Sequence, residues 1–274
     1  VLGDATTLRV QTDSANYSKW GYNNNWWGPV TVEGRTTVTN LSASKPGSYI
    51  GFAGKVTGAG GFDVKGGAKV IFYGKENDFA GDLTVEGVAV EPGTTVNGLA
   101  SGNAGGEICG VLGAVIGVED GSIPTNAGQK VVVKNGHFIH SAQKVLPPVV
   151  SSGTGVVYSP SYSTYTIPEL TGCPVFTNGM AKLTGTWKIR PEDVAAGVPL
   201  TVLGGSSWVY FGEDAAVALT DEAHTAQTAV QLTEGAQNVD FVLTNGLSSE
   251  CFRLKKRDGD LWLAPKVGLC IILK

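Results

Sequence analysis

The chain has 274 residues, 39 of them glycine, and only 16% of its residues are charged. This composition is typical of an extended all-β protein that is long enough to bury one sizeable core. The formal net charge is -4 and the longest basic run is Lys255–Arg257, so we expect no nucleic-acid partner. No stretch reaches the roughly 18 apolar residues that a membrane-spanning helix needs, which argues against such a span.

Aromatic and amide side chains are concentrated in the first predicted unit, residues 1–29, where three asparagines occupy Asn23–Asn25. The candidate ligand-binding side chains of this unit are Trp20, Tyr22, Trp26 and Trp27. Flat aromatic faces beside amides are suited to stacking on sugar rings and to hydrogen bonding with them. A terminal coil also needs a cover over its unpaired strands. We therefore favour a buried aromatic cap, with the sugar platform as the alternative.

Short strands closed by glycine are predicted between Gly58 and Val85. Apolar residues two apart point to the same face of a strand, and three such pairs occur here: Phe62 and Val64, Val70 and Phe72, Leu83 and Val85. The corners between these strands need positive φ, which is permitted at Gly66, Gly67, Gly74 and Gly81. We expect a coil of strands and turns whose core includes Val64, Val70, Phe72, Leu83 and Val85.

The same segment carries a recognisable pattern of glycine, asparagine and apolar residues. Its opening consists of Gly58, Gly60, Gly61 and Phe62, and its close consists of Asn77, Phe79, Gly81, Leu83 and Val85. The pattern resembles the autotransporter-associated β-strand repeat of secreted bacterial surface proteins. This resemblance implies a right-handed parallel β-helix that is exported to the cell exterior and serves in display or adhesion.

A unit of the form apolar-x-Val-charged recurs along the predicted coil region, residues 30–184. It occurs at Val30–Gly34, Phe62–Gly66, Leu83–Gly87 and Val131–Gly136, and its second valines are 32, 21 and 48 residues apart. A period of about 21 to 24 residues, with an insertion in the first interval and two coils in the last, fits a solenoid. A β-sandwich is the alternative, but it needs hairpins about every 8 to 12 residues, and Asn-Gly hairpin signals are few.

A protruding loop is predicted at about residues 145–174, because prolines interrupt this section repeatedly. They are Pro147, Pro148, Pro160, Pro168 and Pro174. Further aromatic candidates, Tyr158, Tyr162 and Tyr165, lie among the serines and threonines of this loop. We include these tyrosines with the N-terminal aromatic residues as a hypothetical surface for a glycan or a partner.

A distinct C-terminal β region is predicted for residues 185–274. Pro191 at the first helical position and Gly197 past the end bracket one helical turn. A second short helix is expected at about residues 221–230. The rest of the chain predicts an antiparallel meander of three strands, at about residues 251–255, 260–264 and 269–273. The turn between the first two strands is expected at Arg257–Gly259.

The four cysteines are Cys109, Cys173, Cys251 and Cys270. They lack the CxxC spacing of zinc and thioredoxin-like sites, and their even number permits two disulfides. In the predicted meander, Cys270 lies on the core face and Cys251 points the other way. We therefore favour buried free thiols over a Cys251–Cys270 bridge.

No catalytic or metal-binding residue is assigned. His137 and His140 are three apart on one predicted strand, so they face opposite sides and do not share a metal; we expect both to be solvated. Acidic pairs such as Glu192–Asp193 adjoin turns, so we interpret them as solvated corners rather than as the two carboxylates of a glycosidase. Lys188 and Arg190 share a strand face, but no acidic group accompanies them as in β-helix pectinases and lyases.

The sequence thus predicts an all-β protein, a right-handed parallel β-helix with an N-terminal cap and a C-terminal antiparallel strand region. Its expected role is that of a non-catalytic structural or adhesive module, extracellular or at the cell surface of a bacterium, without a cofactor. Two alternatives remain open. One is a glycan-binding or glycan-cleaving β-helix protein, and the other is an extracellular filament whose coil stacks add end to end.

Overall fold

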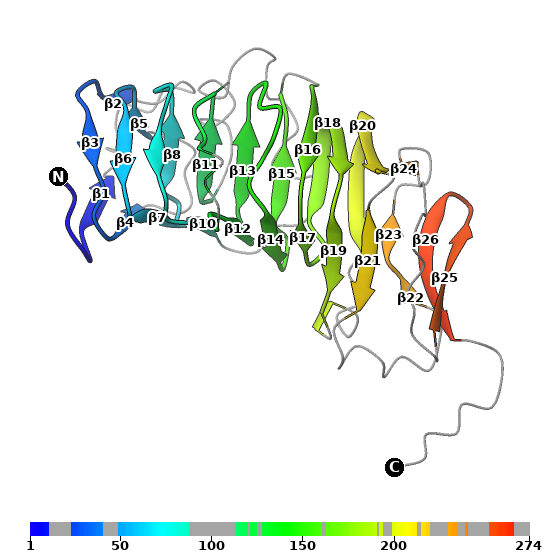
Figure 1. The fold of residues 1–274 in the computed structure, drawn as a ribbon. Helices are drawn as coiled ribbons and strands as arrows, with labels where there is room; N and C mark the ends of the chain where they lie inside the picture. Colours follow the sequence, from blue (N-terminus) through cyan, green and yellow to red (C-terminus); the bar gives the residue numbers. More distant parts are fainter. Residues whose placement is uncertain are drawn as a thin grey trace, which may run out of the picture.

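The chain folds into an elongated stack of parallel strands (Figure 1). The computed structural model describes residues 1–10, 23–40, 49–87, 113–119, 121–124, 126, 128–160, 163–190, 192–193, 199–212, 215–219, 230–234, 239–240 and 252–265. Among these residues, no helix is long and apolar enough to cross a membrane.

The first sheet runs the length of the stack and has nine strands. In spatial order they are β1 (Thr7–Val10), β4 (Arg35–Asn40), β7 (Gly61–Gly66), β10 (Leu83–Glu86), β12 (Val131–Lys134), β14 (Val149–Ser152), β17 (Leu170–Thr171), β19 (Thr186–Ile189) and β21 (Ala216–Leu219). Successive coils of the chain each add one strand to this sheet, and every neighbouring pair is parallel.

The second sheet runs beside the first and grows by the same rule. Its strands in order are β2 (Asn23–Trp26), β5 (Tyr49–Phe52), β8 (Lys69–Phe72), β11 (Val115–Val118), β13 (His137–His140), β15 (Val156–Tyr158), β18 (Val175–Leu183), β20 (Leu200–Phe211) and β23 (Thr233–Glu234), with β16 (Thr164–Ile167) on β18 and β24 (Val239–Asp240) on β20. A third, short sheet consists of β3 (Val30–Thr31), β6 (Val56–Gly58) and β9 (Asp78–Phe79). The predicted parallel β-solenoid is thereby confirmed.

Apolar residues stack in rows inside the solenoid because the strand register aligns equivalent positions of successive coils. One row of the first sheet runs through Val38, Val64, Val85 and Val133. The predicted core residues are fully buried, which confirms them: Val64, Val70, Phe72, Leu83 and Val85. Four phenylalanines, Phe52, Phe62, Phe72 and Phe79, meet at ring-centroid distances of 5.2 to 5.7 Å.

Asn77 explains why the repeat pattern has an asparagine at a corner. Its Oδ1 accepts a hydrogen bond from the Val56 backbone at 2.7 Å, and its Nδ2 donates to the Gly74 and Ser122 carbonyls at 2.9 and 2.6 Å. One buried side chain therefore satisfies backbone groups of three successive coils. Gly81 has a different role, because a Cβ there would overlap the backbone of Gly60 in the coil before.

The spacing of the repeats differs from the prediction in two intervals. The first unit, Val30–Gly34, begins in β3 of the third sheet, so its coil enters the first sheet through β4 instead. Val85 and Val133 are direct neighbours in the ladder, so the last interval is one long coil and not two. A long connection between strands leaves the ladder intact, and spacing alone does not distinguish it from an extra coil.

The prediction of a protruding loop at residues 145–174 is wrong. The section forms strands β14, β15, β16 and β17, which continue the sheets. Its prolines stand between these strands, at the corners. A corner residue does not donate to a ladder, so the missing N–H of proline is tolerated there.

The two Asn-Gly pairs among the described residues do not form hairpins. Asn135 has φ 48° and separates β12 from β13, which do not pair with each other. Asn178 and Gly179, with φ 54° and 79°, lie inside β18 where its register on β20 shifts. These residues let one strand continue from one face of the coil to the next, which removes the sequence argument for a sandwich.

The C-terminal region ends the stack with an antiparallel sheet. Its strands are β22 (Val230–Gln231), β26 (Asp260–Pro265) and β25 (Phe252–Arg257), in that order. The predicted hairpin is confirmed, with Asp258 and Gly259 at φ 53° and 87° in its turn. The third described strand of this sheet is β22, and the strand predicted at residues 269–273 lies outside the described part of the chain. Glu192 and Asp193 are helical as predicted, and of the helix expected at 221–230 only Val230 is described, as part of β22.

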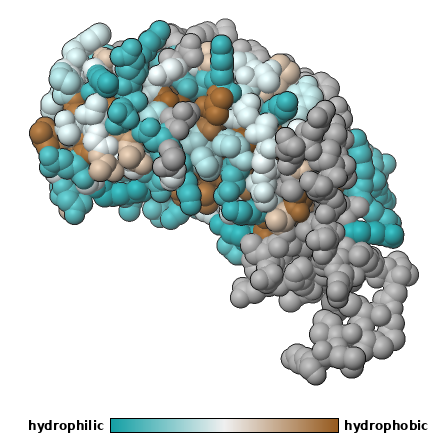
Figure 2. Space-filling view, viewed as in Figure 1, coloured by the Kyte–Doolittle hydropathy of each residue, from teal (hydrophilic) through white to brown (hydrophobic). Residues whose placement is uncertain are grey.

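Cys173 is buried and free. Burial raises the pKa of its thiol to about 12, so it stays protonated. Two disulfides are therefore excluded, while Cys109, Cys251 and Cys270 lie outside the described residues. The face of the molecule seen in Figure 2 is largely hydrophilic, with scattered hydrophobic positions.

Candidate functional site

The N-terminal end of the solenoid holds the candidate site. Among the described residues, β1 pairs only with β4, and β2 pairs only with β5, so these two strands are the first rungs of their sheets. Leu8 continues the interior row of Val38, and Trp26 continues the row of Phe52. Two side chains of the interior rows therefore stand at the end of the stack.

A cavity of about 590 Å³ opens at this end. The described residues that line it are Leu8, Arg9, Asn24, Asn25, Trp26, Trp27, Gly28 and Ile50. We call it the N-terminal hollow. Its volume lies within the range of small-ligand sites, about 300 to 1,000 Å³, and its mixture of apolar surface with a few polar groups is typical of them.

Trp26 and Trp27 present aromatic surface to solvent at the hollow. Their exposed fractions are 50% and 78%, so the expectation that they are buried rings of a cap is wrong for these two residues. Trp26 has Phe52 behind it in the row, but no described residue continues the row beyond it. Trp27 follows the last residue of β2 and leaves the ladder. Trp20 and Tyr22 lie outside the described residues.

Polar groups accompany the two rings. Asn24 is exposed and Asn25 is partly buried on β2, while Arg9 is exposed on β1. The Oδ1 of Asn25 lies over Gly51 of the next coil, in space that a Cβ would occupy. The absence of a side chain at position 51 thus allows Asn25 to pack against the second coil. The hollow combines the aromatic faces of two tryptophans with the exposed amide of Asn24, while the register places the Arg9 side chain in the outward row of Thr39.

The tyrosine candidates are not part of this site. Tyr165 on β16 is 1% exposed within the core, and Tyr158 on β15 is 4% exposed beside Ile71 and Ile139 on the outer side of the second sheet. Burial prevents contact between their rings and an external ligand, so we drop both from the hypothetical binding surface. Tyr162 lies outside the described residues.

The two histidines of β13 face opposite sides, as predicted from their spacing. His140 continues the interior row of Val118, whereas His137 follows Val115 on the outer side of the sheet. The expectation that they are solvated is wrong, because both are buried. Burial lowers the pKa of His140 to about 3 and that of His137 to about 4. Among the described residues, no group of three or more His, Cys, Asp or Glu side chains could hold a metal ion.

His140 has an unusual neighbour in the core. Its ring meets that of Tyr165 at a centroid distance of 4.2 Å in an edge-to-face arrangement. Within the part of the chain that the structure describes, neither ring nitrogen of His140 nor the Tyr165 hydroxyl has a hydrogen-bond partner. Buried polar groups without partners are destabilising, so this pair is a weak point of an otherwise apolar interior.

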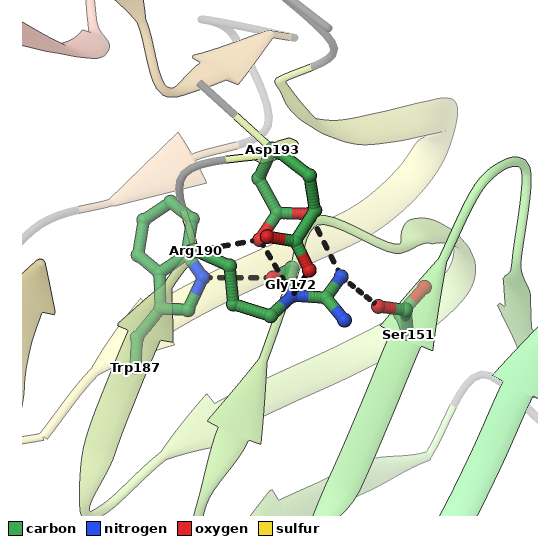
Figure 3. Close-up of polar contacts among 6 residues, drawn as sticks. Ser151, Gly172, Trp187, Arg190 and Asp193 are labelled. Atoms are coloured by element: carbon green, nitrogen blue, oxygen red, sulfur yellow. Dashed lines mark hydrogen bonds and ion pairs between the residues drawn. The ribbon is translucent and has the colours of Figure 1, made fainter. Parts of the chain in front are cut away.

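The acidic partners of Lys188 and Arg190 were missed by the sequence analysis. Lys188 Nζ lies 2.9 Å from Glu169 Oε1. Arg190 donates from Nε and Nη2 to the two carboxylate oxygens of Asp193, at 3.0 and 2.8 Å, as Figure 3 shows. The Asp193 side chain is only 9% exposed, so this residue is not a solvated corner. The pairs come from neighbouring coils and a following turn, which the sequence does not place together.

Arg190, Asp193, Ser151, Trp187 and Gly172 form a cluster, the Arg190 cluster, that links neighbouring coils. Arg190 Nη2 also donates to the Ser151 carbonyl at 2.6 Å, and Trp187 Nε1 donates to the Gly172 carbonyl at 2.9 Å (Figure 3). Nε and Nη2 of Arg190 are both engaged by fixed protein groups, so the bidentate edge of the guanidinium is already occupied by Asp193. We interpret the cluster as structural.

No protein-family model, curated protein or solved structure matches this chain. The resemblance to the autotransporter-associated repeat therefore rests on its own residues and stays a prediction. Leu8, Arg9 and Ile50 are site residues that the sequence analysis did not select. The alternation in Thr7–Val10 predicts a strand. The position of this strand opposite β2, however, depends on how the coil is wound, which a local pattern does not show.

Proposed function

We propose that this protein is a non-catalytic structural and adhesive β-solenoid module that acts outside the bacterial cell and binds glycans at its N-terminal end. The observation that carries this proposal is the exposure of Trp26 and Trp27 in the N-terminal hollow beside the amides of Asn24 and Asn25. The resemblance to the autotransporter-associated repeat supports the extracellular display role.

Sugar recognition fits this arrangement for a physical reason. A sugar ring has an apolar face that stacks on an aromatic ring and a rim of hydroxyls that needs donors and acceptors in the same plane. The exposed Trp27 ring supplies the first, and the exposed amide of Asn24 supplies the second. A protein–protein contact has less use for an open hollow of about 590 Å³.

The absence of carboxylates from the described lining supports binding rather than cleavage. Glycoside hydrolysis needs two carboxyl groups about 5 to 9.5 Å apart on either side of the bond that breaks. The described residues of the hollow include no Asp or Glu. Elsewhere, Asp193 is engaged by Arg190 and Glu169 by Lys188, so neither is a free acid or base.

The filament alternative receives less support from the other end of the molecule. Within the described residues, β25 is one of the two edge strands of the C-terminal sheet, the other being β22. It carries four exposed cationic side chains, Arg253, Lys255, Lys256 and Arg257. Charged residues on an edge strand oppose the addition of another strand, so stacking of a second copy through this edge is disfavoured.

Replacement of Trp27 tests the proposal. Trp27→Ala is expected to weaken binding of an oligosaccharide by at least about tenfold, roughly 1.4 kcal/mol. The free energy of unfolding is expected to change by less than about 0.5 kcal/mol, because the side chain is mostly exposed. A glycan array first identifies a ligand, and calorimetry then compares the wild type with the variant.

Trp262→Ala is the matched control, since Trp262 lies on the C-terminal hairpin under Arg257, away from the hollow. It is expected to leave glycan binding unchanged. Equal loss of affinity in both variants, or no binding of any glycan by the wild type, would refute the proposed site. Stoichiometric release of new reducing ends from a bound glycan would refute the non-catalytic role.

A further inference from the structure

We infer that the N-terminal hollow selects glycans built from 2-acetamido sugars, whose acetamido group lies between an aliphatic patch and two polar side chains. This inference rests on the proposed glycan-binding function and specifies the class of sugar. The patch consists of Leu8 and Ile50, and the polar side chains are Asn24 and Trp26, all of which line the hollow.

The strand register turns these four side chains toward the interior of the first coil. Asn24 is the register partner of Ile50, and the row of Ile50 continues through Val70 in the core. Leu8 and Trp26 are likewise the first described members of interior rows. The hollow is therefore the open end of the interior, and these side chains face whatever enters it.

The aliphatic patch favours a ligand that brings a methyl group. Leu8 on β1 and Ile50 on β5 come from different sheets, and both are partly buried against the main core cluster. The surface that they leave exposed cannot form hydrogen bonds. A sugar hydroxyl held against it would lose water without gaining a partner, which is unfavourable. A methyl group in the same place gains free energy from burial.

Asn24 and Trp26 offer hydrogen bonds beside this patch. The Asn24 amide accepts at Oδ1 and donates from Nδ2, and the Trp26 indole donates from Nε1. Neither side chain forms a hydrogen bond with another described residue. Trp26 Nε1 lies 3.6 Å from the place that a Cβ would occupy at Gly28, so the glycine leaves this N–H uncovered on that side. Both groups are available to a ligand.

An acetamido group uses both parts of the hollow at once. Its N–H can donate to Asn24 Oδ1 and its carbonyl can accept from Trp26 Nε1, while its methyl group contacts the aliphatic patch. Asn24 and Ile50 are neighbours across adjacent strands, about 4.8 Å apart, so one short substituent reaches both. A hydroxyl at the same position of the sugar satisfies the polar groups but leaves the patch without a partner.

The test compares three β-1,4-linked tetramers by calorimetry: N-acetylglucosamine, glucosamine and glucose. They share one backbone and differ only in the substituent at carbon 2. The wild type is expected to bind the acetylated tetramer at least about tenfold more tightly than the glucose tetramer. The glucosamine tetramer keeps the nitrogen but lacks the carbonyl and the methyl group, so it should bind no more tightly than the glucose tetramer.

Two variants assign the preference to the residues that carry it. Leu8→Ser replaces half of the aliphatic patch with a hydroxyl, and Asn24→Ala removes the amide. Each is expected to reduce the tenfold preference to about threefold or less. Asn24 is exposed, so Asn24→Ala should fold normally even if Leu8→Ser lowers the melting temperature. Thr7→Ala is the matched control, because Thr7 is exposed in the outward row of the same strand as Leu8. It should retain the full preference.

Four results would overturn the inference while leaving the proposed glycan-binding function intact. They are equal affinity of the wild type for the acetylated and glucose tetramers, equally tight binding of the glucosamine tetramer, a preference that survives both Leu8→Ser and Asn24→Ala, and array binding confined to glycans without acetamido groups. Absence of binding to every glycan would overturn both.

Discussion

Phe72→Ala is expected to lower the free energy of unfolding by about 3 to 5 kcal/mol. Phe72 is fully buried. Its ring stacks on those of Phe52 and Phe79 at 5.4 and 5.5 Å and meets the edge of Phe62 at 5.2 Å. Truncation to alanine leaves a cavity between three coils that the flanking ladders hold apart, so the surrounding residues can close it only in part.

Reversible denaturation in urea measures this loss, provided that the unfolding slope of the variant matches that of the wild type. Trp27→Ala is the control, because it removes a larger aromatic ring from an exposed position and should change stability little. A loss below about 1 kcal/mol for Phe72→Ala would show that the register of the second sheet is wrong.

The protein is expected to lose stability steeply as the pH falls below 6.5. The pKa of an unfolded histidine is close to 6.5, whereas burial lowers the pKa of His140 to about 3 and that of His137 to about 4. Between these values the unfolded chain binds protons that the folded chain does not, so stability rises with pH across this window. Each histidine contributes about 1.4 kcal/mol per pH unit, or roughly 3 kcal/mol between pH 6.5 and 4.

His140→Leu isolates the contribution of the interior histidine. Among the described residues no charged group faces His140, whose closest ring contact is with Tyr165, so desolvation alone opposes its protonation. The variant removes two buried nitrogens that have no hydrogen-bond partner among the described residues, and it is expected to flatten the pH dependence of the unfolding free energy. His137→Gln should flatten it separately, since the nearby Lys69 also disfavours a charge on His137. Parallel pH profiles for the wild type and His140→Leu would contradict the burial of this residue.

The interior of the solenoid could be predicted from the sequence because alternation is a local property. Phe62, Val64, Leu83 and Val85 face inward wherever their strands pair, and glycine and asparagine mark the corners between strands. The number of coils was harder to predict from the sequence. The single long coil between Val85 and Val133 was predicted as two coils, because the length of a connection does not show whether it joins the ladder.

Burial at the ends of the stack could not be predicted by the same reasoning. Trp26 occupies an interior position in the row of Phe52, and alternation alone predicts a buried ring, but the exposure of a terminal rung depends on what lies beyond it. Tyr165 and His140 show the opposite error. Their polar groups led to the prediction that both side chains lie on the surface, whereas both are buried within the stack of coils. The hollow itself is lined by Arg9, Trp26 and Ile50 from three different strands. A local sequence pattern does not predict that these residues come together.

Hydrogen exchange with and without a saturating oligosaccharide that the glycan array identifies tests the central claim most directly, namely that the N-terminal end of the solenoid is the ligand-binding surface. The account predicts slower deuterium uptake in residues 7–10 and 23–28, which contribute seven of the eight described residues that line the hollow, with no change in the hairpin of residues 252–265. Protection at that hairpin or along the middle of the first sheet, with residues 7–10 and 23–28 unchanged, would contradict it.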